Sequence, residues 1–287
     1  MPVEPSATLH TLRQTVADLT AGGPVEDGRL VGFAVASLDQ ALAGGLACGA
    51  LHEIRPAAPP QGGAATGFAM ALAARALRGR GQAVWIQSDF NIAEAGALYG
   101  PGLDLMGLPM ARLVVLRVPR PRDALWAMEE ALKCRAAGAV VAEFASEDAD
   151  LTATRRLALA AREGGGLGLI LHPNAALSHS SPASGGGMGG GRPSTATTRW
   201  EVASARGERD RFGGFGFGGL GPTTFALSLV KNRRGRTGQW RLSWDHHACT
   251  FATSLSLPVA PAARDRPPYG GPPRDESPRP LPRLRAR

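Results

Sequence analysis

The chain has little cysteine, few aromatic residues and no long apolar run. Its three cysteines, Cys48, Cys134 and Cys249, lie far apart among 287 residues. This spacing argues against a disulfide framework and against a zinc site, and it fits a reducing cytoplasm. No apolar stretch approaches the roughly 18 residues that span a bilayer, and the first residues lack the pattern of a signal peptide. We therefore expect a cytoplasmic protein without membrane contact.

Acidic residues are outnumbered, with 24 Asp and Glu against 32 Lys and Arg, which gives a net charge of +8. This excess is compatible with nucleic acid as a partner. Residues 258–287, however, contain seven Arg against two Asp and one Glu, and they are rich in proline. Such a segment is expected to be a disordered tail. It can be a solvated linker or a docking segment, so the total charge is weak evidence for a binding surface.

The sequence has the glycine spacing of a phosphate-binding loop but lacks the residues that bind phosphate. Such a loop has the pattern G-x-x-x-x-G-K-[ST], in which the Lys neutralises phosphate and the hydroxyl holds Mg²⁺. Gly62 and Gly67 have the required spacing, but the next two residues are Phe68 and Ala69. Neither side chain can perform those roles. The sequence therefore predicts a degenerate nucleotide loop, with ATP binding not expected and no cofactor.

Short apolar runs alternate with helical patterns from residue 37 to residue 173. This alternation predicts an α/β fold with a mostly parallel sheet flanked by helices. Near the C-terminus, residues 224–230 and 239–244 predict an antiparallel hairpin at the edge of the sheet. The other predicted strands are residues 51–54, 83–87, 113–118, 139–144, 167–171 and 198–202, and the predicted helices are residues 68–77, 93–99, 122–136 and 151–162.

Changes in composition divide the chain into three parts. Residues 1–30 form an N-terminal arm with a predicted helix over residues 6–19, which can be a docking arm or can pack on its own domain. Residues 31–257 form the core, interrupted by a Gly- and Ser-rich segment over residues 178–193 that is expected to be a flexible loop. Residues 258–287 are the tail.

The order of these patterns resembles the RecA ATPase core. The stretch over residues 37–54 matches the start of that core, roughly L-D-x-A-L-x-G-G-L-x-x-G-x-x-x-E-I, and Val230-Lys231-Asn232 matches a V-K-N sequence before its last strands. The resemblance covers about residues 35–244. With its degenerate loop and K-N-R-x-G-x-x-G turn, the chain is similar to the ImuA family, which is distantly similar to the cell-division inhibitor SulA.

Resemblance to the ImuA family implies a non-catalytic accessory protein in SOS mutagenesis, the error-prone translesion synthesis that follows DNA damage. The implied partners are an ImuB-like homologue of Y-family polymerases, an error-prone replicative-type polymerase and RecA, with DNA as a further candidate. The protein would be cytoplasmic and associated with the nucleoid when DNA is damaged. Two alternatives stay open: a SulA-like inhibitor of cell division, and a RecA-class ATP-binding repair protein with weak or no hydrolysis.

Two acids follow predicted strands. Glu143 ends the fourth strand, where the resemblance implies an Asp, and Asp89 lies near the position of the catalytic Glu of RecA. The carboxyl ends of strands are where open α/β sheets place their sites. These acids can be a water-activating group and a metal ligand. Without a phosphate-binding Lys we expect instead that they are vestigial.

The hairpin turn is rich in basic side chains. Its glycines would let the backbone approach a partner closely, and Trp240 and Trp244 follow it. The segment can contact phosphates and stack on bases, or it can be a charged sheet edge that prevents aggregation. The candidate contact residues are Lys231, Arg233, Arg234, Arg236, Trp240 and Arg241.

Other candidates are weaker. Residues 178–193 lie where RecA has a mobile DNA-contacting loop, but they contain a single basic residue, Arg192. His246, His247 and Cys249 suggest a metal site. Adjacent residues of a strand point to opposite faces, so the two histidines are not expected to share an ion. We predict no metal site.

Overall fold

The computed structural model describes residues 28–78, 81–145, 148–174, 193–207 and 222–253. The predicted helix over residues 6–19, nearly all of the Gly- and Ser-rich segment and the tail lie outside these described residues. The predictions for those segments therefore remain predictions.

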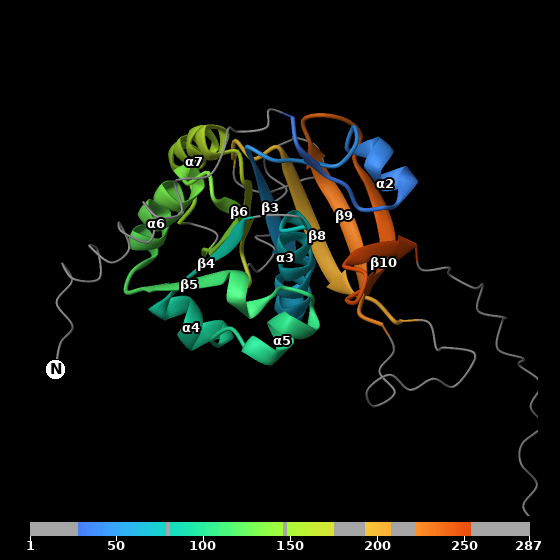
Figure 1. Ribbon diagram of the computed structural model, residues 1–287, viewed down its shortest axis with the longest axis horizontal. Helices are drawn as coiled ribbons and strands as arrows, with labels where there is room; N and C mark the ends of the chain where they lie inside the picture. The colour runs from blue at the N-terminus through green and yellow to red at the C-terminus, as the bar shows by residue number, and fades with distance from the viewer. Residues whose placement is uncertain (1–27, 79–80, 146–147, 175–192, 208–221, 254–287) are drawn as a thin grey trace, which may run out of the picture. The chain divides into compact units, whose positions relative to one another are not determined.

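A nine-stranded sheet forms the centre of the fold, in the order β11-β10-β9-β8-β3-β7-β6-β4-β5 (Figure 1). Strands β8, β3, β7, β6, β4 and β5 are parallel, and β9, β10 and β11 continue the sheet in antiparallel fashion. This confirms the predicted α/β class. The strands are β3 (Ala50–Pro56), β4 (Gln82–Ser88), β5 (Leu113–Val118), β6 (Ala137–Glu143), β7 (Leu167–Leu171), β8 (Thr198–Ser204), β9 (Thr224–Asn232), β10 (Gly238–Asp245) and β11 (Thr250–Thr253).

Helices cover both faces of the sheet. One core contains the buried side of α3 and residues from β8 to β11, and the other contains α6 and α7. Strands β1 (Leu30–Val31) and β2 (Leu46–Ala47) pair with each other before β3. The helices are α2 (Ala36–Ala41), α3 (Gly62–Ala76), α4 (Asp89–Ala95), α5 (Gly100–Leu105), α6 (Pro121–Lys133) and α7 (Leu151–Gly164), with short 3₁₀ turns η1 (Pro59–Gln61) and η2 (Met110–Arg112).

Local sequence explains why these elements form where they do. Strand β6 is buried along its whole length because it lies between two strands and below helices on both faces. Helix α7 begins where the Asp150 carboxylate accepts a hydrogen bond of 2.7 Å from Ala153 N. It ends at Gly165, whose left-handed backbone (φ 75°) suits glycine.

Some boundaries and positions differ from the sequence predictions. The helix predicted over residues 93–99 is α4, which starts at Asp89 because the Ser88 hydroxyl caps it at Asn91 N, and which stops before Gly96 (φ 88°). The short strands β1, β2 and β11 were missed. Strand β11 pairs with β10, so the prediction that the β9–β10 hairpin lies at the sheet edge was wrong.

Candidate functional site

The segment with the phosphate-loop spacing is not a loop. Helix α3 begins at Gly62, so residues 62–69 already lie within its first turns. Gly62 has ordinary right-handed helical angles. The connection from β3 is residues 57–61, which include the turn η1. The structure thus lacks a phosphate-binding loop at the position where the glycine spacing predicted one.

Phe68 and Ala69, which stand where Lys and a hydroxyl residue would bind phosphate, are fully buried in the core. The Phe68 ring lies 5.6 Å from Trp200 and 5.8 Å from both Phe225 and Phe251, measured between ring centroids. Aromatic pairs at such distances add about 0.5–1.5 kcal/mol each beyond burial of their area. The side chain therefore stabilises the fold and does not occupy a ligand site.

Packing accounts for one of the two frame glycines. A Cβ atom at residue 62 would lie 2.5 Å from the carbonyl oxygen of Pro173, which only the absence of a side chain allows. At Gly67 a Cβ atom would lie 3.6 Å from the Phe225 ring, an ordinary contact distance. Gly62 is thus required by the close approach of the chain after β7.

Glu143 is buried at the end of β6 and accepts hydrogen bonds from two side chains of β4. The Trp85 indole donates at 2.8 Å, and the Gln87 amide donates to the two carboxylate oxygens at 3.0 and 3.1 Å. Burial raises the pKa of Glu143, and the two donors only partly oppose this effect. The carboxylate is thus enclosed by its neighbours.

Asp89 lies in the first turn of α4 and is exposed. Its carboxylate pairs with the Arg117 guanidinium at the end of β5, and both side chains are about half exposed or more. Glu143 has the different partners Trp85 and Gln87. The structure therefore gives the two predicted acids separate hydrogen-bond and ion-pair partners.

The start of the hairpin turn is anchored to the protein. Lys231 Nζ and Arg233 Nη2 donate to the carbonyl oxygen of Ser194, at 2.7 and 3.4 Å. The Asn232 amide donates to Ala41 O at 2.9 Å, at the end of α2. Burial lowers the pKa of Lys231, and neighbouring arginines lower it further. Lys231 thus has a structural role.

Exposed charge in the turn is limited to Arg233, Arg234 and Arg236, whereas Arg241 is half-buried and donates to Arg206 O. Trp240 is half-buried and packs against the core. Trp244 is buried, with its ring 4.7 Å from Phe251 and its indole bonded to Met106 O. The hypothesis of two tryptophans available for stacking on bases is therefore wrong for Trp244.

The two adjacent histidines lie in the turn after β10, not on a strand as assumed from the sequence. Their ring centroids are 4.1 Å apart. Among the described residues, no group of three or more His, Cys, Asp or Glu side chains could hold a metal ion.

Sequence reasoning missed a row of charged side chains across three strands, of which two are buried. Glu53 on β3 faces Arg199 on β8, which faces Lys231 on β9. The Arg199 guanidinium pairs with the buried Glu53 carboxylate and donates to Ser194 Oγ. Burial raises the pKa of Glu53, but the charge and hydrogen bonds of Arg199 outweigh it and lower the pKa overall. The H-E-I motif predicted only a strand, because Arg199 lies 146 residues after Glu53 in the chain.

His52 of the same motif is also structural. Trp200 Nε1 donates to Thr198 Oγ1 at 2.9 Å, that hydroxyl lies 2.8 Å from His52 Nδ1, and His52 Nε2 lies 2.9 Å from Ala47 O. Burial lowers the pKa of His52 to about 4. A neutral ring with its proton on Nε2 satisfies all of these contacts.

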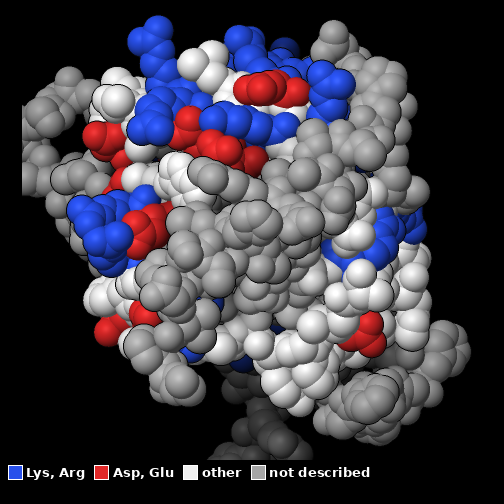
Figure 2. All heavy atoms as spheres, turned by 60° about the vertical axis from the view of Figure 1, so that its left-hand side comes forward, with Lys and Arg blue, Asp and Glu red and all other residues white. Residues whose placement is uncertain are grey.

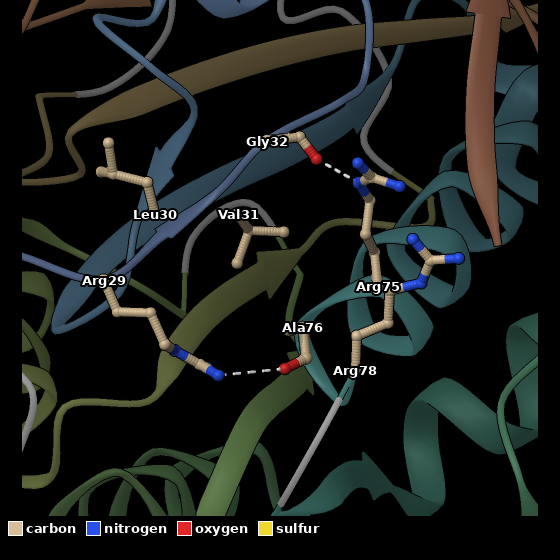
Figure 3. A pocket seen from close by; sticks show the side chains of 7 residues that line it. All are labelled: Arg29, Leu30, Val31, Gly32, Arg75, Ala76 and Arg78. Carbon is tan, nitrogen blue, oxygen red and sulfur yellow. Dashed lines mark hydrogen bonds between the residues drawn. The ribbon is translucent and has the colours of Figure 1, made fainter.

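A cavity of about 230 Å³ lies at the C-terminal end of α3, and the sequence gave no indication of it. Three of its lining residues are Arg29, Arg75 and Arg78, and Figure 3 shows two of them linking the helix to the segment around β1. Arg29 Nη1 donates to Ala76 O at 3.3 Å, and Arg75 donates to Gly32 O. We call these three residues and the space between them the arginine pocket.

Charges differ between the two ends of the parallel strands. The first turns of α4 and α6 contain Asp89 and Asp123, whereas the last turns of α3 and α7 contain Arg75 and Arg162. Figure 2 shows Lys and Arg side chains along its upper edge, with some Asp and Glu side chains among them, at the side where Figure 1 draws α2 and α7. We call the two ends of the parallel strands the carboxyl edge and the amino edge.

Comparison with known proteins identifies relatives of this chain. No model of a known protein family matches it. Two curated sequences do, both named protein ImuA, from Caulobacter vibrioides strain NA1000 / CB15N and strain ATCC 19089 / CIP 103742 / CB 15. Each is 34% identical over 209 residues, which cover 69% of this chain and 76% of the relative. None of the helices in the described ranges has the length and apolar character of a membrane span.

Proposed function

The chain belongs to the ImuA family, and on that basis we propose that it is a non-catalytic accessory protein in SOS-induced, error-prone translesion synthesis. Its role would be to bring an ImuB-like polymerase homologue together with RecA or DNA. The order of the parallel strands with antiparallel strands added at one side supports a RecA-like core.

The burial of Phe68 supports a non-catalytic role most directly. A phosphate-binding Lys at this position would have to replace a ring that touches Trp200, Phe225 and Phe251 in the core. Such a group could not reach a phosphate without rearrangement of the fold. The packing around Phe68 therefore supports a role without phosphate chemistry at this position.

Exposed apolar residues near strand β5 support a protein partner. β5 is the last strand at its side of the sheet, so its outer backbone groups are unpaired within the described sheet. Val114 and Val115 on this strand are 37% and 48% exposed, and Trp126 on α6, which packs on β5, is 44% exposed. An exposed apolar edge strand is a ready template for a further strand. We propose that the ImuB-like homologue docks here.

Calorimetric titration with Mg-ATP tests the non-catalytic role. We expect no binding heat and no hydrolysis above a buffer blank. Hydrolysis that Asp89→Asn or Glu143→Gln abolishes would instead support the alternative of a RecA-class ATPase.

Co-purification with the ImuB-like homologue tests the partner surface. Val115→Lys should lower recovery of the partner at least about tenfold, because a buried unpaired charge opposes strand addition. Leu159→Lys, at a residue on α7 that is 60% exposed, is the matched control and should leave recovery unchanged. Equal recovery with both variants would refute docking at β5. Cell filamentation on overexpression without the polymerase genes would favour the SulA-like alternative.

A further inference from the structure

We propose that the amino edge of the sheet binds the phosphodiester backbone of nucleic acid, and that the arginine pocket holds one phosphate group. This inference rests on the proposed function for its biological role, and it names a binding surface that differs from the carboxyl edge where a ligand was expected. Three observations on the described residues support it: a row of arginines, the pocket, and the absence of carboxylates within ion-pair distance of the three pocket arginines.

An arginine accompanies the amino end of each of six adjacent strands. Arg29 contacts Cys48 just before β3, and the others lie in the connections or last helical turns that lead into their strands, or in the hairpin turn beside Thr197. Neighbouring strands are about 4.8 Å apart, so the row spans roughly 24 Å. In sheet order from β8 to β5 the residues are Arg233, Arg29, Arg162, Arg135, Arg78 and Arg112.

The arginine pocket adds a concave point to this row. Arg29 is held by bonds to Cys48 Sγ, Ala76 O and Gly138 O, at 3.2, 3.3 and 3.4 Å. Arg75 is held through Nε and Nη1, which leaves its Nη2 group without a described partner. Arg78 is exposed, and among the described residues it donates a hydrogen bond only from Nη2, to Ala248 O. Each guanidinium has five N–H donors, so donors remain for an anion.

No described carboxylate lies within ion-pair distance of Arg29, Arg75 or Arg78. Asp39 is the acid that acts on Arg75, but its carboxylate accepts a hydrogen bond of 2.6 Å from Phe33 N. At the carboxyl edge, by contrast, Arg117 is paired with an aspartate. Among the described residues, the three arginines of the pocket therefore form no ion pair, and Asp39 is the one acid that acts on Arg75.

A long polyanion fits these features better than a small anion. A free phosphate would need one cavity, whereas the arginines extend along the ends of six strands. Helix dipoles explain why a basic residue in a last helical turn is favourable. They do not explain Arg135, which follows α6, or Arg233 in the hairpin turn. Arginine guanidinium groups are well suited to pair with phosphate.

Fluorescence anisotropy with a labelled oligonucleotide, single-stranded and duplex, tests the proposal on the full chain over a salt series. The amino-edge variant Arg78→Gln, Arg135→Gln, Arg162→Gln removes three exposed charges. It should weaken binding at least about tenfold at low salt. It should also reduce the slope of log K against log salt by about 2, since each lost contact with a single strand accounts for about 0.7.

The matched control is Arg120→Gln, Arg122→Gln, Arg155→Gln, which removes three exposed arginines near the N-terminal ends of α6 and α7, at the carboxyl edge of the sheet. It changes the net charge equally and should alter binding less than about twofold. An equal loss with both variants, or no binding by the unmodified chain, would overturn the proposal. Circular dichroism melts of all variants exclude unfolding as the cause.

Inorganic phosphate distinguishes the two sources of the anion. In the proposed case phosphate competes weakly with the oligonucleotide, and Arg78→Gln removes this competition. If phosphate stabilises the protein through Arg78 while the amino-edge variant binds oligonucleotide normally, the pocket takes a free anion and the polyanion surface is refuted. Complementation of mutagenesis in an ImuA-deficient bacterium is scored separately. An intact phenotype with lost nucleic-acid binding would overturn the biological role proposed for this surface and leave the accessory function standing.

Discussion

The two ends of the parallel strands differ in the interaction partners of their charged side chains. At the carboxyl edge Glu143 is enclosed by hydrogen-bond donors, and Asp89 is neutralised by Arg117. At the amino edge Arg75 and Arg78 bond to backbone carbonyl oxygens and have no described carboxylate partner. The acids at the end that resembles a catalytic site thus have partners within the protein, whereas these two arginines at the other end form no described ion pair.

This difference shows why motif spacing is a weak guide to the site here. Open α/β sheets usually bind ligands at the carboxyl ends of their strands. In this chain the helix that would present phosphate-binding groups has its first turns packed into an aromatic cluster around Phe68. A surface for partners then depends on features without a motif, such as exposed arginines and an open strand edge.

The largest expected effect is that of Phe68→Lys. If the carboxyl edge retained a nucleotide site, this change would restore the missing Lys and increase ATP binding. We expect instead a loss of more than about 4 kcal/mol in the free energy of unfolding, because an unpaired charge enters the core. Urea denaturation measures the loss, and calorimetry should detect no ATP binding.

The conservative change Phe68→Leu is the control for that prediction. It should destabilise the fold by about 1–3 kcal/mol, since it removes the aromatic contacts but keeps an apolar side chain. A Phe68→Lys protein of normal stability would contradict the assignment of this position to the core.

Arg29→Ala should have the next largest effect and separates two kinds of arginine at the amino edge. Arg29 donates to Ala76 O, Gly138 O and Cys48 Sγ, so its loss should lower the free energy of unfolding by about 2 kcal/mol. Arg78→Ala should change the same quantity by less than about 0.5 kcal/mol, because Arg78 is exposed. Equal thermal shifts in both variants would show that this distinction is wrong.

Glu143→Gln should have a smaller effect, whose sign depends on pH. Burial raises the pKa of Glu143 above its ordinary value of 4.5. The folded state therefore binds its proton more tightly than the unfolded state, and the stabilisation is present below that value and is lost as the pH rises through the folded pKa. Gln carries no charge, so relative to the unmodified chain the variant should gain stability as the pH rises from about 4.5.

Denaturation of both proteins at pH 4 and pH 7 measures this effect, with the difference expected to be about 1 kcal/mol. A matched test is Glu53→Gln, because Arg199 lowers the pKa of Glu53. The stabilisation that the Glu53 carboxylate provides is present at pH values above its ordinary pKa, and it is lost as the pH falls through the pKa of the folded state. The penalty of that variant should therefore be greatest at neutral pH. The same pH trend for both variants would contradict these environments.

Much of the fold was predictable from the sequence because continuous apolar runs define buried parallel strands. Strands β5 and β7 have the predicted limits, and the resemblance to ImuA is confirmed by two relatives. The candidate site was less predictable, since glycine spacing does not distinguish a phosphate loop from close packing. Residue 62 must be glycine because a Cβ atom there would clash with the carbonyl oxygen of Pro173. The arginine pocket joins residues 29 and 78, a proximity that no local pattern reveals.

The smallest expected effect, that of Asp89→Asn, tests whether the carboxyl edge has any catalytic role. The Asp89–Arg117 pair is exposed on both sides, and such pairs contribute about 0–1 kcal/mol. Stability should thus fall by at most about 0.5 kcal/mol in thermal melts, and complementation of mutagenesis should remain normal. Arg117→Gln should give the same small change in stability, because it removes the same pair from the other side. A null mutagenesis phenotype for Asp89→Asn with unchanged stability, and a normal one for Arg117→Gln, would mean that the carboxylate itself acts on a ligand. The conclusion that the carboxyl edge has no functional acid would then be wrong.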